Sequence, residues 1–139
     1  MDLPNAIICD IDRTLALFGE SENPYHRDYL KDSVNRSVYA ILCRFQADTT
    51  IFLVTGRKES DRVVTKQWLA NNAIPYDYLY MRQTDDIRND YTIKLEIYNK
   101  YIKYRCNVIA VFDDRLQVCR LWYELGLPLF RVGNPDADF

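Results

Sequence analysis

The sequence lacks any hydrophobic run close to the roughly 18 residues that a membrane-spanning helix needs. Residues 1–5 also lack the basic start and the long apolar stretch of a signal peptide. The formal net charge is only −2, so overall charge does not demand nucleic acid or an anionic membrane as a partner, and only a local basic patch stays open. We therefore expect a cytoplasmic protein without a membrane partner, whose 139 residues form one domain, 1–139, around a single core.

Closely spaced cysteines are also missing. The four cysteines stand at positions 9, 43, 106 and 119, and no two of them form a C-x-x-C pair. A structural zinc site is therefore a weak interpretation. Buried free thiols in a reducing compartment are the interpretation that we prefer.

Several catalytic motifs are absent as well. The sequence contains no G-x-x-x-x-G-K-[ST] loop, no G-x-G-x-x-G loop and no G-x-S-x-G elbow. Its single histidine, His26, lies in a polar segment, which argues against a histidine-based triad or a His-rich metal site. We interpret His26 as part of a surface flap, with a contact to substrate as the alternative.

What the sequence does contain is a regular alternation of apolar strands and amphipathic helices. The strands are expected at 6–11, 50–54, 76–81, 108–112 and 129–132, and the helices at 34–46, 60–72, 90–104 and 115–125. Residues 13–32 are predicted to be a loop or flap, with Asp32 or Ser33 as the cap of the first helix. This alternation predicts an α/β fold with three layers, a mostly parallel sheet covered by helices on both faces.

Three of these strands end in polar residues. Asp10 and Asp12 follow the first strand, Thr55 follows the second, and Asp113 and Asp114 follow the fourth. Each acidic pair alone could be a turn or a helix cap. Because ligands bind outside the carboxyl ends of parallel strands, the two pairs together predict a carboxylate cage for one Mg²⁺ ion.

Other residues near these strand ends suit a phosphate group. The Thr55 hydroxyl, the amide of Gly56 and the Arg57 guanidinium are candidate donors to phosphate oxygens. Lys94 follows Asp90 by four residues, and such a pair is first of all a feature of a helix surface. The functional alternative is a lysine that neutralises the nucleophile and the phosphate and is held by Asp90.

The segment 10–14, Asp-Ile-Asp-Arg-Thr, resembles the D-x-D-x-T motif of the haloacid dehalogenase (HAD) superfamily, and Thr55, Lys94 and the acidic pair 113–114 resemble its remaining motifs in the right order. The resemblance implies an HAD-like fold and a phosphatase that forms an aspartyl-phosphate. Asp10 would be the nucleophile and Asp12 the general acid and base. The ion would be held by Asp10, the Asp12 carbonyl and the acidic pair, while Thr55, Lys94 and Arg57 hold the phosphoryl oxygens.

A closer resemblance is to the phosphatase domain of phage polynucleotide kinase/3′-phosphatases. The similar stretches include residues 55–57, 88–90, 94–96 and 112–115 and the final pair 138–139. This resemblance implies removal of 3′-phosphates from DNA or RNA ends. Those enzymes carry a kinase domain before the phosphatase; we expect none here, and a separate kinase or ligase as a partner.

The sequence departs from that family in two places. Arg13 stands where a glycine is usual, and could add a phosphate contact or narrow the site. In the flap, residues 22–25 replace an arginine followed by Gly-Pro-Tyr, and Arg27 comes after them.

The connections between the predicted elements leave no room for a large cap domain, and an open site suits a polymer end. Six basic residues could follow a nucleic-acid backbone, and eleven tyrosines could stack on bases; the basic residues are Arg57, Lys58, Arg62, Lys66, Arg82 and Arg88. Ordinary surface charge and half-buried tyrosines explain the same residues. Two alternatives therefore stay open: a phosphatase of nucleotides or other small esters, and a non-catalytic binding domain on the same fold.

Overall fold

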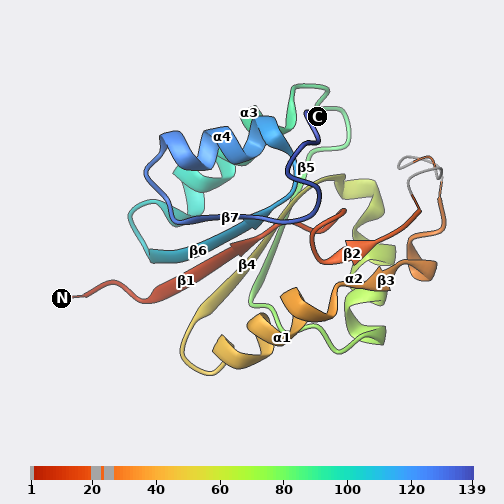
Figure 1. Cartoon of the computed structure of the whole chain (residues 1–139), viewed down its shortest axis with the longest axis horizontal. Helices are drawn as coiled ribbons and strands as arrows, with labels where there is room; N and C mark the ends of the chain where they lie inside the picture. Colours follow the sequence, from red (N-terminus) through yellow and green to blue (C-terminus); the bar gives the residue numbers. More distant parts are fainter. Residues whose placement is uncertain (1, 20–22, 24–26) are drawn as a thin grey trace.

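A computed structural model describes residues 2–19, 23 and 27–139. Its centre is a five-stranded parallel sheet in the order β5-β4-β1-β6-β7 (Figure 1). The strands are β1 (Asn5–Cys9), β4 (Thr50–Lys58), β5 (Tyr78–Arg82), β6 (Asn107–Asp113) and β7 (Leu129–Arg131). The most apolar strands, β1, β4 and β6, occupy the middle, where both faces of a strand are covered.

Side chains of β1 alternate between two hydrophobic cores. Ile7 and Cys9 belong to the core on one face of the sheet, whereas Ala6 and Ile8 belong to the core on the other face. This alternation is the period-two geometry of a strand that is buried on both sides. The sheet is therefore the middle layer of the fold.

In the described part of the chain, two helices cover each face of the sheet. The first core is closed by α1 (Arg36–Phe45) and α2 (Arg62–Asn71), and the second by α3 (Asp90–Ile97) and α4 (Leu116–Glu124). Figure 1 shows α3 and α4 above the sheet and α1 below it. Trp68 of α2 and Trp122 of α4 are fully buried, one in each core. The predicted three-layer α/β fold is confirmed, and no cap domain is evident in the part of the chain that the structure describes.

The segment predicted as a flap contains regular structure. A short antiparallel ribbon joins β2 (Ala16–Leu17) to β3 (Ser33–Val34), and a turn of 3-10 helix covers Tyr29–Lys31. His26 and most of the segment 22–25 lie outside the described residues.

The prediction for the start of the first helix was wrong. The helix begins at Arg36, and its cap is Asn35, whose side-chain oxygen accepts hydrogen bonds from the amides of Ser37 and Val38. Ser33 instead pairs with Leu17 in the ribbon, and Asp32 forms ion pairs that are described below. A strand pairing formed by residues distant in sequence displaces the helix start by two residues.

Other element bounds differ in smaller ways. The helix predicted at 90–104 is α-helical only to Ile97, and Tyr98–Ile102 continues it as a π-helical turn. Strand β4 continues to Lys58, with a change of register against β5 between Val54 and Lys58. All four cysteines are free thiols, and Cys9 and Cys119 are buried. No helix among the described residues is long and apolar enough to cross a membrane.

Candidate active site

Three buried carboxylates meet at the carboxyl ends of β1 and β6. One oxygen from each of Asp10, Asp113 and Asp114 lies within 4.8 Å of the others. The register of the sheet brings them together, because Cys9 pairs with Phe112 and the Asp10 amide donates to the Phe112 carbonyl at 2.9 Å. The parallel sheet thus gathers residues that are about a hundred positions apart in the sequence.

The ammonium group of Lys94 lies between two of these carboxylates. Its Nζ donates to Asp10 Oδ1 and to Asp113 Oδ2, each at 2.9 Å, and only 2% of the residue is exposed. Burial alone would lower the pKa of Lys94, but the adjacent Asp10 and Asp113 raise it above its ordinary value. Lys94 therefore stays positively charged in the protein interior.

The three carboxylates hold more negative charge than Lys94 can balance. Burial, together with Asp113 and Asp114, raises the pKa of Asp10 well above its ordinary value, although Lys94 opposes the shift. Converging carboxylate oxygens with an excess of negative charge are a donor set that suits a hard divalent cation such as Mg²⁺. The residues present therefore fit a metal site formed by Asp10, Asp113 and Asp114.

Two further contacts orient these acidic groups, and we did not predict either from the sequence. Thr14 Oγ1 lies 3.1 Å from Asp10 Oδ2 and 3.3 Å from Asp114 Oδ1, so that its hydroxyl serves one of them at a time. The indole Nε1 of Trp122 donates to Asp113 Oδ2 at 3.2 Å. The sequence signal for Thr14 was its place as the last residue of the D-x-D-x-T stretch. The signal for Trp122 was that a buried indole N–H generally needs an acceptor.

Asp12 lies outside the triplet, and its carboxylate contacts two arginines instead. It accepts from Arg57 Nη2 and from Arg27 Nη2, each at 2.6 Å. Burial would raise the pKa of Asp12, but the contacts with Arg57 and Arg27 outweigh it and lower the pKa. Any role for Asp12 in metal binding would therefore rest on its main-chain carbonyl.

Arg57 and Asp32 complete this ion-pair network. Arg57 Nη1 donates to Thr65 Oγ1 at 3.1 Å, and its Nη2 lies 3.5 Å from Asp32 Oδ2. Asp32 also accepts from Arg27 Nε at 3.0 Å. The guanidinium of Arg57, which we expected to bind phosphate, is thus directed at protein groups. Asp32, which we expected to cap a helix, is an ion-pair partner instead.

Thr55 and Gly56 lie within β4 rather than after it. Thr55 Oγ1 accepts from the Arg57 amide at 3.1 Å, so its own hydroxyl proton is available to another group. At Gly56 a Cβ atom would come within 2.5 Å of Asp90 Oδ1. A side chain at position 56 would therefore have to displace the Asp90 carboxylate.

The predicted pairing of Asp90 with Lys94 is wrong as a hydrogen-bonded contact. The Asp90 carboxylate accepts from Arg82 Nη2 and from Arg115 Nη1, whereas Lys94 binds the acidic triplet. Arg82 also donates to the carbonyls of Gly56, Asp86 and Arg88, so its guanidinium connects β4 to the loop before α3. We had named Arg82 as a candidate for substrate binding, but in this structure its guanidinium contacts protein groups.

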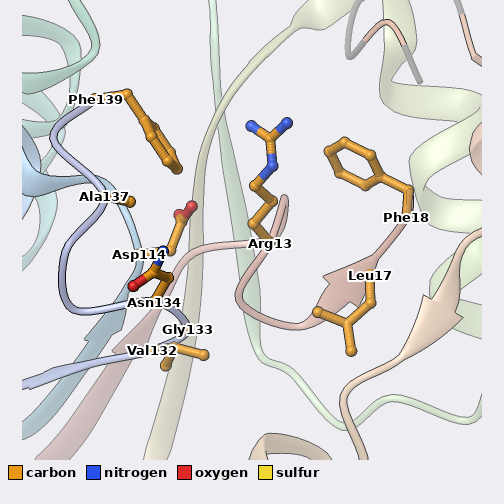
Figure 2. Close-up of a pocket in the computed structure, with 9 residues that line it drawn as sticks. All are labelled: Arg13, Leu17, Phe18, Asp114, Val132, Gly133, Asn134, Ala137 and Phe139. Carbon is orange, nitrogen blue, oxygen red and sulfur yellow. The ribbon is translucent and has the colours of Figure 1, made fainter. Parts of the chain in front are cut away.

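Arg13 lies beside the triplet with a backbone φ of 62°. This left-handed conformation favours glycine, which agrees with the glycine that the family resemblance led us to expect at this position. The Arg13 guanidinium lies 4.9 Å from the ring centroid of Phe18 and 5.3 Å from that of Phe139. In Figure 2 it stands between these two rings, at a pocket that Asp114 also lines.

The fold and the acidic site together define a phosphatase domain of the HAD type, and comparisons with known proteins narrow the class. The family model for the polynucleotide kinase PNKP phosphatase domain matches residues 4–139. This chain belongs to that family.

Relatives of known name agree with this assignment. A protein of Autographa californica nuclear polyhedrosis virus, named as a bifunctional polynucleotide kinase/RNA ligase, is 36% identical over 144 residues, covering 98% of this chain and 20% of the viral protein. Chains from two solved Pnkp1/Rnl/Hen1 complexes, one of them described as an RNA repair complex, match with a TM-score of 0.90 at 37% and 38% identity. These matches cover 97% of this chain but only 44% and 48% of those chains. The chain thus spans less than half the length of these relatives.

Proposed function

We propose that this domain removes 3′-phosphates from DNA or RNA ends, with Mg²⁺ as cofactor and Asp10 as nucleophile. The observation that carries the proposal is the fixed position of the Asp10 carboxylate. One of its oxygens accepts from Lys94 and the other from Thr14, beside Asp113 and Asp114. A carboxylate held on both oxygens is oriented for attack before substrate arrives.

The reaction would proceed through two displacements. In the first, Asp10 attacks phosphorus, the bond to the ester oxygen breaks, and Asp12 gives its proton to that oxygen. In the second, the Asp12 carboxylate takes a proton from water, which attacks the aspartyl-phosphate, releases inorganic phosphate and restores Asp10. The arginines beside Asp12 favour its ionised form, which suits its role as base in the second step. The first step needs the protonated form, so substrate binding must loosen at least one of these contacts.

The charge on the transferring phosphoryl group needs donors and a cation. Lys94 and the Thr55 hydroxyl supply donors at the edge of the sheet, and the Gly56 amide is a third candidate. Mg²⁺ held by Asp10, Asp113 and the main-chain carbonyl of Asp12, with Asp114 beside them, would offset negative charge on the phosphoryl oxygens.

Polynucleotide ends are the substrate that the family favours. The matching family is named for a polynucleotide kinase, one relative is named as a kinase/RNA ligase, and another was solved in a Pnkp1/Rnl/Hen1 RNA repair complex. The absence of an evident cap over the described site also suits a polymer end. A separate kinase or ligase is the partner that we propose. Nucleotides and other small phosphate esters are the second candidate class, and a non-catalytic domain on this fold is the third.

The test is phosphate release, with magnesium, from a 3′-phosphorylated oligonucleotide, a 3′-mononucleotide and p-nitrophenyl phosphate. A preference of about tenfold or more in kcat/KM for the oligonucleotide corresponds to about 1.4 kcal/mol of differential transition-state binding and supports the proposal. Equal or faster turnover of the two small esters would leave the proposed chemistry in place, but it would exclude polynucleotide ends as the preferred substrate.

A second measurement separates an enzyme from a binding domain. Asp10→Asn keeps the size of the side chain and removes the nucleophile, so turnover should be lost while circular dichroism stays that of the wild type. If oligonucleotide binding survives and the wild type never releases phosphate, the domain is a binding module.

A further inference from the structure

A pocket of about 340 Å³ opens beside the acidic triplet. Its lining includes Arg13, Phe18, Asp114, Asn134 and Phe139 (Figure 2). Asp114 belongs both to this pocket and to the triplet, so a group bound in the pocket would lie next to the proposed phosphate site. The mechanism proposed above uses none of the other four residues.

Two aromatic rings and one guanidinium give this pocket its chemical character. Phe139 stands on one side of Arg13 and Phe18 on the other (Figure 2). Phe18 also has the Arg27 guanidinium over its ring, 3.5 Å from the centroid. Among the described residues, no carboxylate or carbonyl oxygen accepts a hydrogen bond from the Arg13 side chain, so its position rests on the rings and on its own backbone.

The backbone of Arg13 is held firmly enough to place that side chain. Its amide donates to the Ala16 carbonyl at 2.8 Å, and the Ala16 amide donates to the Ile11 carbonyl at 2.8 Å. This tight turn imposes the positive φ of Arg13. The guanidinium therefore leaves the loop of the nucleophile in a direction that the turn dictates.

The opposite wall is also fixed. The Leu116 amide donates to the main-chain oxygen of Phe139 at 2.7 Å. Arg131 donates to the carbonyls of Asp114, Pro135 and Ala137, which ties the segment after β7 to the acidic pair. Phe139, 40% exposed as a residue, is thus presented to solvent on a backbone with several anchors.

We propose that this pocket receives the nucleobase of the end nucleotide whose phosphate is removed, stacked against the Arg13 guanidinium and the Phe139 ring. The inference rests on the proposed function and adds to it a binding site for the base of the end nucleotide. Aromatic rings and guanidinium planes are the surfaces on which proteins stack unpaired bases, and such stacking tolerates any base. The volume lies at the lower end of the range for small-ligand pockets, which suits one base.

The test compares two oligonucleotides that differ only at the end nucleotide. Both carry a 3′-phosphate; one ends in an ordinary nucleotide and the other in a base-free tetrahydrofuran residue. The wild type should prefer the first by about tenfold in kcat/KM, as expected when one stacked base is lost. Equal kcat/KM values for the two ends would overturn the inference.

Variants locate the effect. Phe139→Ala should reduce the tenfold preference to below about threefold, since stacking on that ring would be lost. Arg13→Lys keeps the positive charge without the planar group and should also reduce the preference. Tyr123→Ala, on the exposed side of α4 where 74% of the tyrosine is accessible, is the matched control and should retain it. Full retention of the preference in both Phe139→Ala and Arg13→Lys would overturn the inference.

The same assay separates this inference from the proposed function. If p-nitrophenyl phosphate is hydrolysed and neither oligonucleotide releases phosphate, the polynucleotide substrate is wrong and the base pocket is wrong with it. If both oligonucleotides release phosphate at the same rate, only the base pocket is wrong.

Discussion

The ammonium of Lys94 donates to Asp10 Oδ1 at 2.9 Å, across 84 positions of the sequence. The contact joins α3 to the end of β1 and places a buried positive charge on the candidate nucleophile. In the resting site it balances part of the acidic triplet; in the transition state it would face the phosphoryl oxygens.

Replacing Lys94 tests this role. Lys94→Met keeps the length of the side chain and removes its charge, so kcat for p-nitrophenyl phosphate should fall by about a hundredfold or more, as when a transition-state donor is lost. Lys100→Met, at an exposed position, is the matched control and should keep wild-type turnover. Circular dichroism of both variants should show the native fold. A fall in kcat of under about threefold for Lys94→Met would return Lys94 to a structural role.

The acidic triplet makes a prediction about metal removal. Excess chelator should abolish phosphate release, and added Mg²⁺ should restore it, because three carboxylates with one lysine need a further cation. Beryllium fluoride, which mimics a phosphorylated aspartate, should inhibit at millimolar concentration or below. Activity that persists in excess chelator would remove the metal from the mechanism, and indifference to beryllium fluoride would count against Asp10 as nucleophile.

The sequence predicted most of the framework because its signals are local. Buried strands appear as short apolar runs, and the polar residues after them, Asp10 and the pair 113–114, identify the sheet edge where they meet. The spacing of Asp90 and Lys94 misled for the same reason. Spacing along one helix cannot show that Arg82 and Arg115, from other elements, donate to the Asp90 carboxylate. Lys94 then contacts the acidic triplet instead.

Residues with two possible roles were the ones that the sequence could not settle. Trp122 fits the apolar stripe of a helix, and only the tertiary structure shows that its indole N–H reaches Asp113. Asp32 is a good helix cap by residue type, but Arg27 and Arg57 lie close enough to pair with it. For Asp32, a contact with a residue of another element replaces the local preference, whereas Trp122 keeps its place in the core and gains a polar partner as well.

Asn35 offers a separate test of how the nucleophile loop is supported. Its side-chain oxygen caps α1, and its Nδ2 donates to the Thr14 carbonyl at 3.0 Å. Asn35→Ala should lower the free energy of unfolding by about 1 kcal/mol through loss of the cap. Asn35→Ser can keep the cap but not the contact to Thr14, so kcat should fall severalfold with a smaller loss of stability.

Urea denaturation and steady-state kinetics on the same preparations check both effects. Ser33→Ala is the control, since Ser33 lies in the β2–β3 ribbon and its hydroxyl donates to the Leu17 carbonyl rather than to the helix or to the nucleophile loop. If Ser33→Ala destabilised the protein more than Asn35→Ala did, the assignment of the cap would be wrong. If Asn35→Ser left kcat unchanged, the contact to Thr14 would have no part in positioning the loop.

The contact between Gly56 and Asp90 gives the last prediction. A methyl group at Gly56 would come within 2.5 Å of Asp90 Oδ1, and Asp90 cannot easily move away because Arg82 and Arg115 hold it. Gly56→Ala should therefore cost about 1–3 kcal/mol of stability, as overpacking does. The backbone of Gly56 has no positive φ, so conformational strain adds nothing to that cost.

In an Asp90→Ala background the added cost of Gly56→Ala should fall below about 0.5 kcal/mol, because the clash is gone and alanine also restricts the unfolded chain. Denaturation of the wild type, the two single variants and the double variant measures the coupling. Additive losses would mean that Asp90 is not what excludes a side chain at position 56, and the shape of this part of the site would then need another cause.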